Sequence, residues 1–267
     1  SYVIDPVFFP GGNIGELAIN GTVNDLAMCG AIPQYLSLAF IIEEGLPMKD
    51  FWDILVSIKT AAQKANVKIV TGDTKVVEKG KGDKIFINTS GIGLMHANAN
   101  IHHNNIAAGD VVIVSGNIAT HGIAIMSVRK GLEFETSIES DTTNLNHTVT
   151  DLLSRFGPDI KFLRDPTRGG IASVLNEIAE LTTLGFELSQ SLIPIDEQVD
   201  AACEMLGLDP LYVANEGIFI AIVFLAPNAF DLILITIASK AHENNKNQNK
   251  NPFDVCVVSV CVRNFSV

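Results

Sequence analysis

The sequence predicts an α+β protein built in two halves, and three observations support this class. Apolar residues recur at helical spacing in some segments and form short runs of strand length in others. The two kinds of segment do not alternate strictly, as a βαβ protein would require. Residues 97–109 are small and polar, which is typical of a linker. We therefore expect an N-terminal domain at 1–97, a linker at 98–109 and a C-terminal domain at 110–267, with an atypical tail from about 242.

The first half is predicted to contain both helices and strands. Its opening residues alternate like a strand already in progress, which suggests that earlier sequence is missing. Asn13 follows a glycine turn and is a plausible helix N-cap. The periodicity then predicts a helix at 14–29, a strand at 34–42, a helix at 47–66, and strands at 67–71 and 84–95.

The second half repeats the mixture with shorter elements. The patterns predict strands at 111–115, 160–163, 186–188 and 217–224, and helices at 122–129, 149–155, 171–182, 196–206 and 229–242. No regular βαβ order emerges, which is why we predict α+β.

The amino-acid composition argues against several classes of function. The 267 residues are 47% apolar and carry a formal net charge of −12. An acidic chain without a basic stripe argues against nucleic acid and anionic membranes as partners. No apolar run approaches the roughly 20 residues that span a bilayer, and the first residues do not resemble a signal peptide. The four cysteines lack zinc-type spacing, so we expect reduced thiols in the cytoplasm.

The segment Arg164-Asp165-Pro166-Thr167-Arg168-Gly169-Gly170 is the strongest candidate site. It lies between a predicted strand and a predicted helix, whose first N–H groups and dipole favour an anion. Glycine would let the backbone approach a phosphate closely. Asp165 would repel a bare phosphate, which indicates a divalent cation between the two. The alternative is a capped turn with a solvated Arg–Asp pair.

Two further acidic segments favour the same cation. Asn24-Asp25 lies on a face of the first helix that should point inward, where an unpaired carboxylate is costly. Residues 71–75, Thr-Gly-Asp-Thr-Lys, follow a predicted strand and would form a turn that binds a metal-held phosphate. We expect Asp25, Asp73 and Asp165 to gather around one magnesium-bound triphosphate. The alternatives are a solvated Asp25 and a plain turn at 71–75. No P-loop or dinucleotide fingerprint is present.

Other residues are weaker candidates. His121 stands at a predicted helix start, where it could contact a substrate or be structural. Glu43 and Glu44 end a strand and could supply a base. Asn215-Glu216-Gly217 is either a turn or a contact of the second domain with the site.

Four blocks of sequence carry a resemblance to a known family. They are SYVIDPVFFPGGNIGELAINGTVNDLAMCGA, TGDTKVVEKGKGDKIFINTSGIG, LRDPTRGGIASVLNEIAE and LGLDPLYVANEG. The chain resembles the HypE hydrogenase maturation family of the aminoimidazole ribonucleotide synthetase superfamily. The resemblance implies a two-domain PurM-like fold and a homodimer. The N-terminal sheets of two subunits would form a shared barrel, a C-terminal α/β lobe would lie beside it, and ATP with Mg²⁺ would bind between the halves.

The resemblance also implies a reaction. A carbamoyl group is loaded by the carbamoyltransferase HypF onto a C-terminal cysteine, and ATP drives its dehydration to a thiocyanate. The cyanide then passes to iron on a HypC–HypD complex, toward the [NiFe]-hydrogenase site. Two alternatives stay open: another ATP-using synthetase or kinase of the superfamily, and a truncated, inactive scaffold.

Residue roles follow from the resemblance. Asp25, Asp73 and Asp165 would bind Mg²⁺, and the catalytic candidates are Lys75, Arg168, Glu43 and His121. The nucleotide contacts would be Asp5, Asn24, Thr71, Gly72, Asp73, Thr74, Lys75, Thr167, Arg168, Gly169 and Gly170.

The chain departs from the family pattern at several positions. Ala119-Thr120 replaces a usual Gly-Asp, and Ile218 replaces a usual lysine. The family ends in Pro-Arg-Ile-Cys, whereas residues 264–267 are Asn-Phe-Ser-Val. Cys256 and Cys261 lack that context, so we give neither the role of acceptor.

Overall fold

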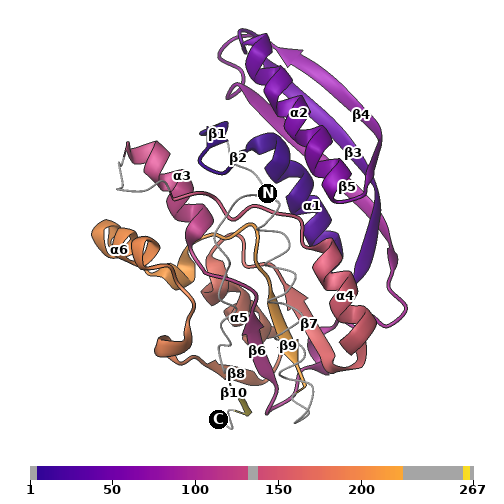
Figure 1. Cartoon of the computed structure of the whole chain (residues 1–267), viewed down its shortest axis with the longest axis vertical. Coiled ribbons are helices and arrows are strands. Elements are labelled where there is room, and N and C mark those ends of the chain that lie inside the picture. The colour runs from indigo at the N-terminus through magenta and orange to yellow at the C-terminus, as the bar shows by residue number, and fades with distance from the viewer. Residues whose placement is uncertain (1–4, 132–137, 225–260, 265–267) are drawn as a thin grey trace.

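The computed structural model describes residues 5–131, 138–224 and 261–264. Figure 1 shows a three-stranded sheet with two helices at one end of the molecule and a second sheet with four helices at the other. This arrangement confirms the α+β prediction. The predicted helix at 229–242 lies outside the described residues, as do residues 1–4 of the predicted opening strand.

The three-stranded sheet has β3 (Ala31–Glu43) at its centre. β4 (Lys68–Val77) pairs parallel with β3 on one side, and β5 (Ile85–Met95) pairs antiparallel on the other. One face of β3 is buried against α1 (Ile14–Met28) and α2 (Met48–Lys64), through residues that include Leu36, Leu38 and Phe40. The opposite face is exposed, so this sheet is covered on one side only.

Helix α1 joins the two halves of the molecule. Asn13 caps it, as predicted, by accepting the N–H groups of Gly15 at 2.8 Å and Glu16 at 3.4 Å. Leu17 packs in the core beneath the three-stranded sheet, whereas Met28 packs among residues of α4, β7 and β9. Because α1 contacts both cores, most of its circumference is buried, as expected for a helix that is apolar on most sides.

The second sheet is antiparallel throughout, in the order β7-β9-β6-β10-β8. Its strands are β6 (Val111–Val114), β7 (Ile160–Arg164), β8 (Leu184–Glu187), β9 (Ile220–Val223) and β10 (Cys261–Asn264). The helices beside it are α3 (Thr120–Lys130), α4 (Asn146–Phe156), α5 (Gly170–Leu181) and α6 (Glu197–Leu206). A two-stranded ribbon, β1 (Phe8–Phe9) and β2 (Gly12–Asn13), precedes α1. Most predicted elements in the described ranges are present with ends shifted by a few residues.

The prediction of a turn at residues 71–75 is wrong. β4 runs without a break from Lys68 to Val77, and Gly72 and Asp73 lie opposite Leu38 and Ala39 of β3. A Cβ atom at Gly72 would lie 1.9 Å from the carbonyl oxygen of Leu38. The glycine is therefore needed because the backbones of β3 and β4 approach closely at this position, which is a known reason for a glycine inside a strand.

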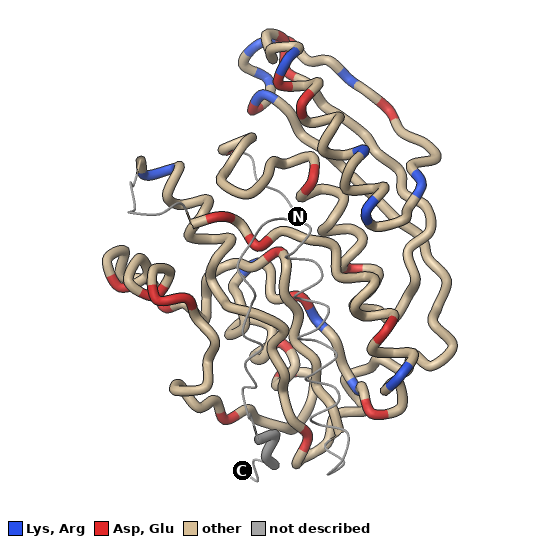
Figure 2. Tube along the Cα trace, in the orientation of Figure 1, with Lys and Arg blue, Asp and Glu red and all other residues tan. Residues whose placement is uncertain are grey.

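Surface properties of the described residues are mixed. Figure 2 shows acidic and basic residues interspersed around the three-stranded sheet, while α6 carries acidic residues without a basic one. None of the described helices combines the length and hydropathy that a membrane span requires.

Candidate active site

A cleft of about 550 Å³ lies between α1, α3, the β7–α5 turn and the segment before β9. This volume is in the range of small-molecule sites. Charged and polar side chains from all four segments line it: Asp25, His121, Arg129, Arg164, Arg168 and Glu216. Arginines beside carboxylates suit a ligand that carries phosphate and a bound cation.

The β7–α5 turn forms one wall of the cleft. β7 ends at Arg164 and α5 begins at Gly170, which confirms the predicted strand, turn and helix. Thr167 and Arg168 line the cleft beside the start of α5. Gly170 has a φ of 61°, and a Cβ atom there would lie 2.3 Å from the carbonyl oxygen of Leu211. This glycine is thus required by packing against the protein's own backbone, in addition to any phosphate contact.

Asp165 is buried at the base of this turn. Only 6% of its surface is exposed, so the alternative of a solvated Arg–Asp pair is wrong for this residue. Burial, and to a lesser degree the negative charge of Asp25, raises the pKa of Asp165 to about 6. Asp25 is exposed where it lines the cleft, so the prediction that it points into the protein interior is wrong. Partial desolvation still raises the pKa of Asp25, against the opposing charge of Arg164. Two neighbouring carboxylates with raised pKa values form a site that a divalent cation would stabilise.

Asp73 does not join these two carboxylates within one chain. Among the described residues, no group of three or more His, Cys, Asp or Glu side chains is placed to hold a metal ion. The predicted single-chain cluster of Asp25, Asp73 and Asp165 is therefore wrong. Asp73 is exposed on β4, where its carboxylate accepts the N–H of Thr74 at 2.8 Å. The other candidates on this strand, Thr71, Gly72, Thr74 and Lys75, are exposed with it.

His121 and Glu216 lie in the wall of the cleft although the sequence separates them widely. His121, 3% exposed, starts α3, and its Nδ1 lies 2.7 Å from the Ser140 hydroxyl. Burial lowers the pKa of His121 to about 4, and Arg129 acts in the same direction, so the ring is neutral at pH 7. Glu216, 8% exposed, comes from the Asn-Glu-Gly triplet that the sequence left open between a turn and a site contact.

Glu43 is outside this cleft, so its prediction as a base for the site is not supported. Its carboxylate accepts the backbone N–H groups of Lys84, at 3.0 Å, and Gly80. These two hydrogen bonds hold the pKa of Glu43 below its ordinary value, whereas a base needs the opposite shift. Glu43, Glu44 and Asp5 line a second cavity of about 520 Å³.

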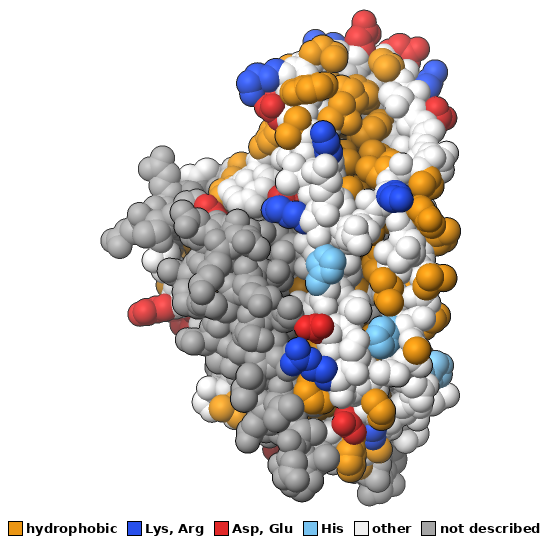
Figure 3. All heavy atoms as spheres, turned by 45° about the vertical axis from the view of Figure 1, so that its right-hand side comes forward, with side chains coloured by type: hydrophobic (Ala, Val, Ile, Leu, Met, Phe, Trp, Pro, Cys, Tyr) orange, Lys and Arg blue, Asp and Glu red, His pale blue; other side chains and the backbone are white. Residues whose placement is uncertain are grey.

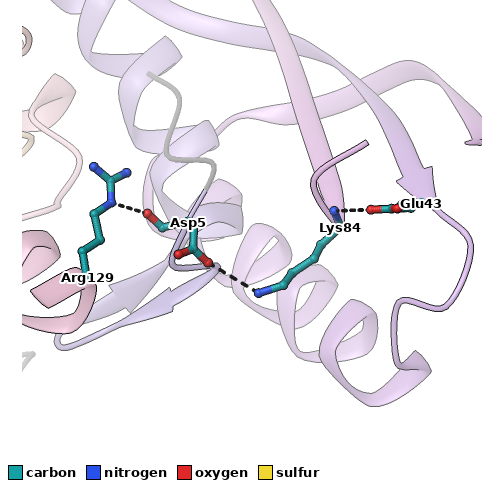
Figure 4. A network of polar contacts seen from close by, with 4 residues as sticks. All are labelled: Asp5, Glu43, Lys84 and Arg129. Carbon is teal, nitrogen blue, oxygen red and sulfur yellow. Dashed lines mark hydrogen bonds and ion pairs between the residues drawn. The ribbon is translucent and has the colours of Figure 1, made fainter. Parts of the chain in front are cut away.

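Asp5 lines this second cavity and contacts both Lys84 and Arg129, as Figure 4 shows. The Asp5 carboxylate forms an ion pair with Lys84 at 3.4 Å, and its carbonyl oxygen accepts a hydrogen bond from Nε of Arg129. Arg129 lines the cleft. Asp5 therefore contacts one residue of the cleft wall, Arg129, and a direct contact between Asp5 and a nucleotide stays a prediction.

Asn24 is structural in this arrangement. It is 1% exposed, and its amide donates to the carbonyl oxygens of Thr143 at 3.0 Å and Glu216 at 3.4 Å. Its side-chain oxygen accepts the N–H of Leu145 at 2.8 Å. The side chain fastens α1 to the loop before α4, which leaves none of its polar hydrogens for the predicted nucleotide contact.

The fold corresponds to a known class of two-domain proteins. The family model described as AIR synthase related protein, N-terminal domain, matches residues 1–95, and the model of the corresponding C-terminal domain matches residues 107–241. Together the two matches cover most of the chain.

The chain belongs to the HypE branch of the AIR synthase related family. It is 52% identical over 236 residues to "Carbamoyl dehydratase HypE" of Rhizobium leguminosarum bv. viciae, which is 88% of this chain and 67% of that protein. The structure of a HypE–HypF complex matches with a TM-score of 0.89 and 45% identity, over 98% of this chain and 81% of the other. A HypE structure in complex with ATP matches with a TM-score of 0.89 and 41% identity, over 99% and 75% of the two chains.

Proposed function

We propose that this chain is an ATP-dependent carbamoyl dehydratase. It converts a protein-bound S-carbamoyl cysteine to a thiocyanate, which supplies the cyanide ligands of a [NiFe]-hydrogenase site. The observation that carries the proposal is the cleft lined by Asp25, Arg164 and Arg168. Asp165 is buried in the β7–α5 turn that forms one wall of this cleft. The relatives named carbamoyl dehydratase and the ATP-bound HypE structure support the assignment.

The reaction requires phosphoryl transfer followed by loss of phosphate, and residues of the cleft contribute to it. The amide oxygen of the carbamoyl group attacks the γ-phosphorus of ATP, so an O–P bond forms and ADP leaves. The carbon–oxygen bond then breaks, phosphate departs, and loss of the two N–H protons leaves a C≡N group on sulfur. Arg168 and Arg164 neutralise charge on the transferring phosphoryl group, and the N-terminus of α5 adds a partial positive charge. Catalysis here consists mainly of positioning and charge neutralisation.

The metal belongs to the acidic corner of the cleft. Asp25 and Asp165 would provide carboxylate oxygens, the ligands that Mg²⁺ prefers. Desolvation raises the pKa of both groups, and the charge of Asp25 contributes to the raised pKa of Asp165. Asp25 and Asp165 would hold Mg²⁺, which would supply positive charge to the phosphates in this part of the cleft. We assign proton removal to Glu216, because Asp25 and Glu216 are the two carboxylates that line the cleft within the described residues.

We further propose that the active form is a homodimer joined through the open face of the three-stranded sheet. Tyr35 and Ile92 lie opposite each other on β3 and β5 and are 41% and 66% exposed. Ile41 of β3 and Leu94 of β5 are exposed apolar residues on the same two strands. Figure 3 shows hydrophobic side chains gathered over this end of the molecule. A patch of this extent on a sheet marks an interaction site.

A homodimer would also explain the position of Asp73. Asp73 and Lys75 pair with Ala39 and Ile41 of β3, so their side chains share the open face. We propose that Asp73 and Lys75 serve the cleft of the second subunit. Mixing D25N chains with D73N chains tests this assignment. If the site is shared, each mixed dimer contains one intact cleft and recovers part of the activity; if both residues serve their own cleft, no activity returns.

The partners and boundaries stay proposals. The HypE–HypF complex supports a HypF-type carbamoyltransferase as partner, and we extend the proposal to a HypC–HypD-type acceptor and to the cytoplasm. The domain boundaries 1–97, 98–109 and 110–267 are supported by β5 ending at Met95 and β6 starting at Val111.

The test of the proposed function uses mass spectrometry and phosphate release. The chain is loaded with the HypF-type partner and then given Mg-ATP. The expected product is a cysteine adduct lighter by one water, with one ADP and one phosphate per adduct. ATP hydrolysis without adduct dehydration would indicate a different enzyme of the superfamily. Absence of both nucleotide binding and hydrolysis would identify an inactive scaffold.

A further inference from the structure

Two consecutive buried residues, Ser140 and Asp141, contact two residues of the cleft wall, His121 and Glu216, that lie far apart in the sequence. Ser140 is fully buried and Asp141 is 7% exposed. Both belong to the loop between the described end of α3 and the start of α4. Neither lines the cleft, so any role in the reaction must act through other residues.

Ser140 contacts His121. Its hydroxyl lies 2.7 Å from Nδ1 of the ring and also accepts the N–H of Thr142 at 3.1 Å. Its own N–H donates to the carbonyl oxygen of Pro10 at 2.8 Å, which fixes the serine to the turn before α1. The other side of the ring is bounded by Phe9, whose ring meets it edge-on at 5.7 Å. A ring held at one nitrogen and packed on one side has a single orientation.

Asp141 holds the segment that carries Glu216. Its carboxylate accepts the N–H of Glu216 at 3.2 and 3.3 Å and the N–H of Gly217 at 3.1 Å. A Cβ atom at Gly217 would lie 1.7 Å from the carbonyl oxygen of Asp141, so only glycine permits this approach. Hydrogen bonds from N–H groups to a buried carboxylate are among the stronger ones in proteins.

We propose that Ser140 and Asp141 are positioning residues that hold the His121 ring and the Glu216 carboxylate in register across the cleft wall. The proposal rests on the proposed function, because it assumes that His121 and Glu216 face the carbamoyl substrate. Because Ser140 and Asp141 are adjacent, a displacement of this loop would move the His121 ring and the Glu216 carboxylate together. Ser140 and Asp141 therefore act together: the serine orients the His121 side chain, and the aspartate holds the backbone at Glu216 and Gly217.

The Ser140 half of the proposal has a spectroscopic test. Nitrogen chemical shifts of ¹⁵N-labelled imidazole report which ring nitrogen carries the proton. In the unaltered protein without nucleotide, His121 should show one tautomer at pH 7. In S140A the same ring should show a mixture that exchanges. The matched control is S127A, because Ser127 is a buried serine of α3 whose hydroxyl donates to Ala124. A mixed tautomer in the unaltered protein, or an unchanged single tautomer in S140A, would overturn this half.

The Asp141 half is tested by hydrogen exchange and kinetics. D141N should lose protection at the N–H groups of Glu216 and Gly217, and kcat should fall about 10- to 100-fold with little change in KM for ATP. The control is D110N. Asp110 is a buried aspartate away from the cleft, and its carboxylate accepts a hydrogen bond from Lys161 at 2.9 Å. Unchanged protection in D141N, or an equal fall of kcat in D110N, would refute it. The tautomer and exchange measurements need no turnover, so they remain decisive if the dehydratase proposal itself fails.

Discussion

Residues 164–170 and residues 71–75 contain the same kinds of side chain: threonine, glycine and a cationic residue beside an aspartate. The first segment folds as a turn that buries its aspartate in a cleft. The second continues as a strand with its aspartate exposed. Pro166 accounts for part of the difference, because it lacks an N–H and keeps the preceding residue from a helical conformation. Residues 71–75 contain no proline, and β3 is long enough to pair with them as far as Val77. The residue types alone therefore do not determine whether a segment forms a turn with a buried aspartate. The presence of a neighbouring strand to pair with decides whether the segment becomes a strand instead.

The largest expected effect separates the two aspartates as metal ligands. D165N should weaken Mg²⁺-dependent ATP binding about 100-fold, or about 3 kcal/mol, because one of the two proposed carboxylate ligands of the cation is lost. D73N should weaken binding in the dimer and leave the affinity of a dissociated monomer unchanged. Isothermal titration calorimetry with and without Mg²⁺ measures both. An unchanged affinity in D165N would remove the metal site from the cleft.

The two glycines next to these aspartates give the next test. G170A and G72A should each lower the free energy of unfolding by about 3 kcal/mol, because the new methyl group meets backbone carbonyl oxygens of Leu211 and Leu38. G80A is the control: its φ is 83° but nothing lies within 4 Å of the added Cβ, so a cost of about 1 kcal/mol is expected from φ alone. Only G170A should also reduce ATP affinity. If urea unfolding shows that G72A lowers the free energy of unfolding no more than G80A does, the close approach of β4 to β3 at Gly72 is refuted.

A pH profile tests the burial of Asp165. Its folded pKa of about 6 lies above the ordinary 3.8, so the folded state binds the extra proton between these values. The stability that this group contributes is complete below about pH 3.8 and is lost as pH rises through 6. D165N should therefore gain stability over the unaltered protein, from nearly zero at pH 4 to about 3 kcal/mol at pH 7. His121 has the opposite sign but is common to both proteins and cancels in the difference. A pH-independent difference in urea midpoints would contradict the assignment.

The smallest effect concerns Ala119. It is the N-cap residue of α3 and has a φ of 71°, where an L-residue with a Cβ is strained, and its N–H donates to Asn215 at 2.7 Å. A119G should raise the free energy of unfolding by about 1 kcal/mol. A124G, at a buried helical position of the same helix, should lower it by about the same amount. Thermal unfolding distinguishes the two, and a loss of stability in A119G would show that the methyl group's packing outweighs the strain.

The resemblance to the HypE family and the RDPTRGG site could be predicted from the sequence, because both depend on residues that are neighbours in the chain. The Asn13 cap, the strand at β7 and the helix at α5 follow from local periodicity and hydrogen-bonding capacity. The departure at Ala119 was also visible, although the sequence could not show that the position has a positive φ.

The sequence by itself determined the type and order of the helices and strands, the family, and the aspartates worth testing. The tertiary structure alone decided how these parts combine. It placed Asp25 beside Asp165, left Asp73 on an open sheet face, and used Asn24 as a fastening between α1 and a distant loop. The physical reason is that burial and pKa depend on which distant segments cover a side chain, and local pattern carries no information about that cover.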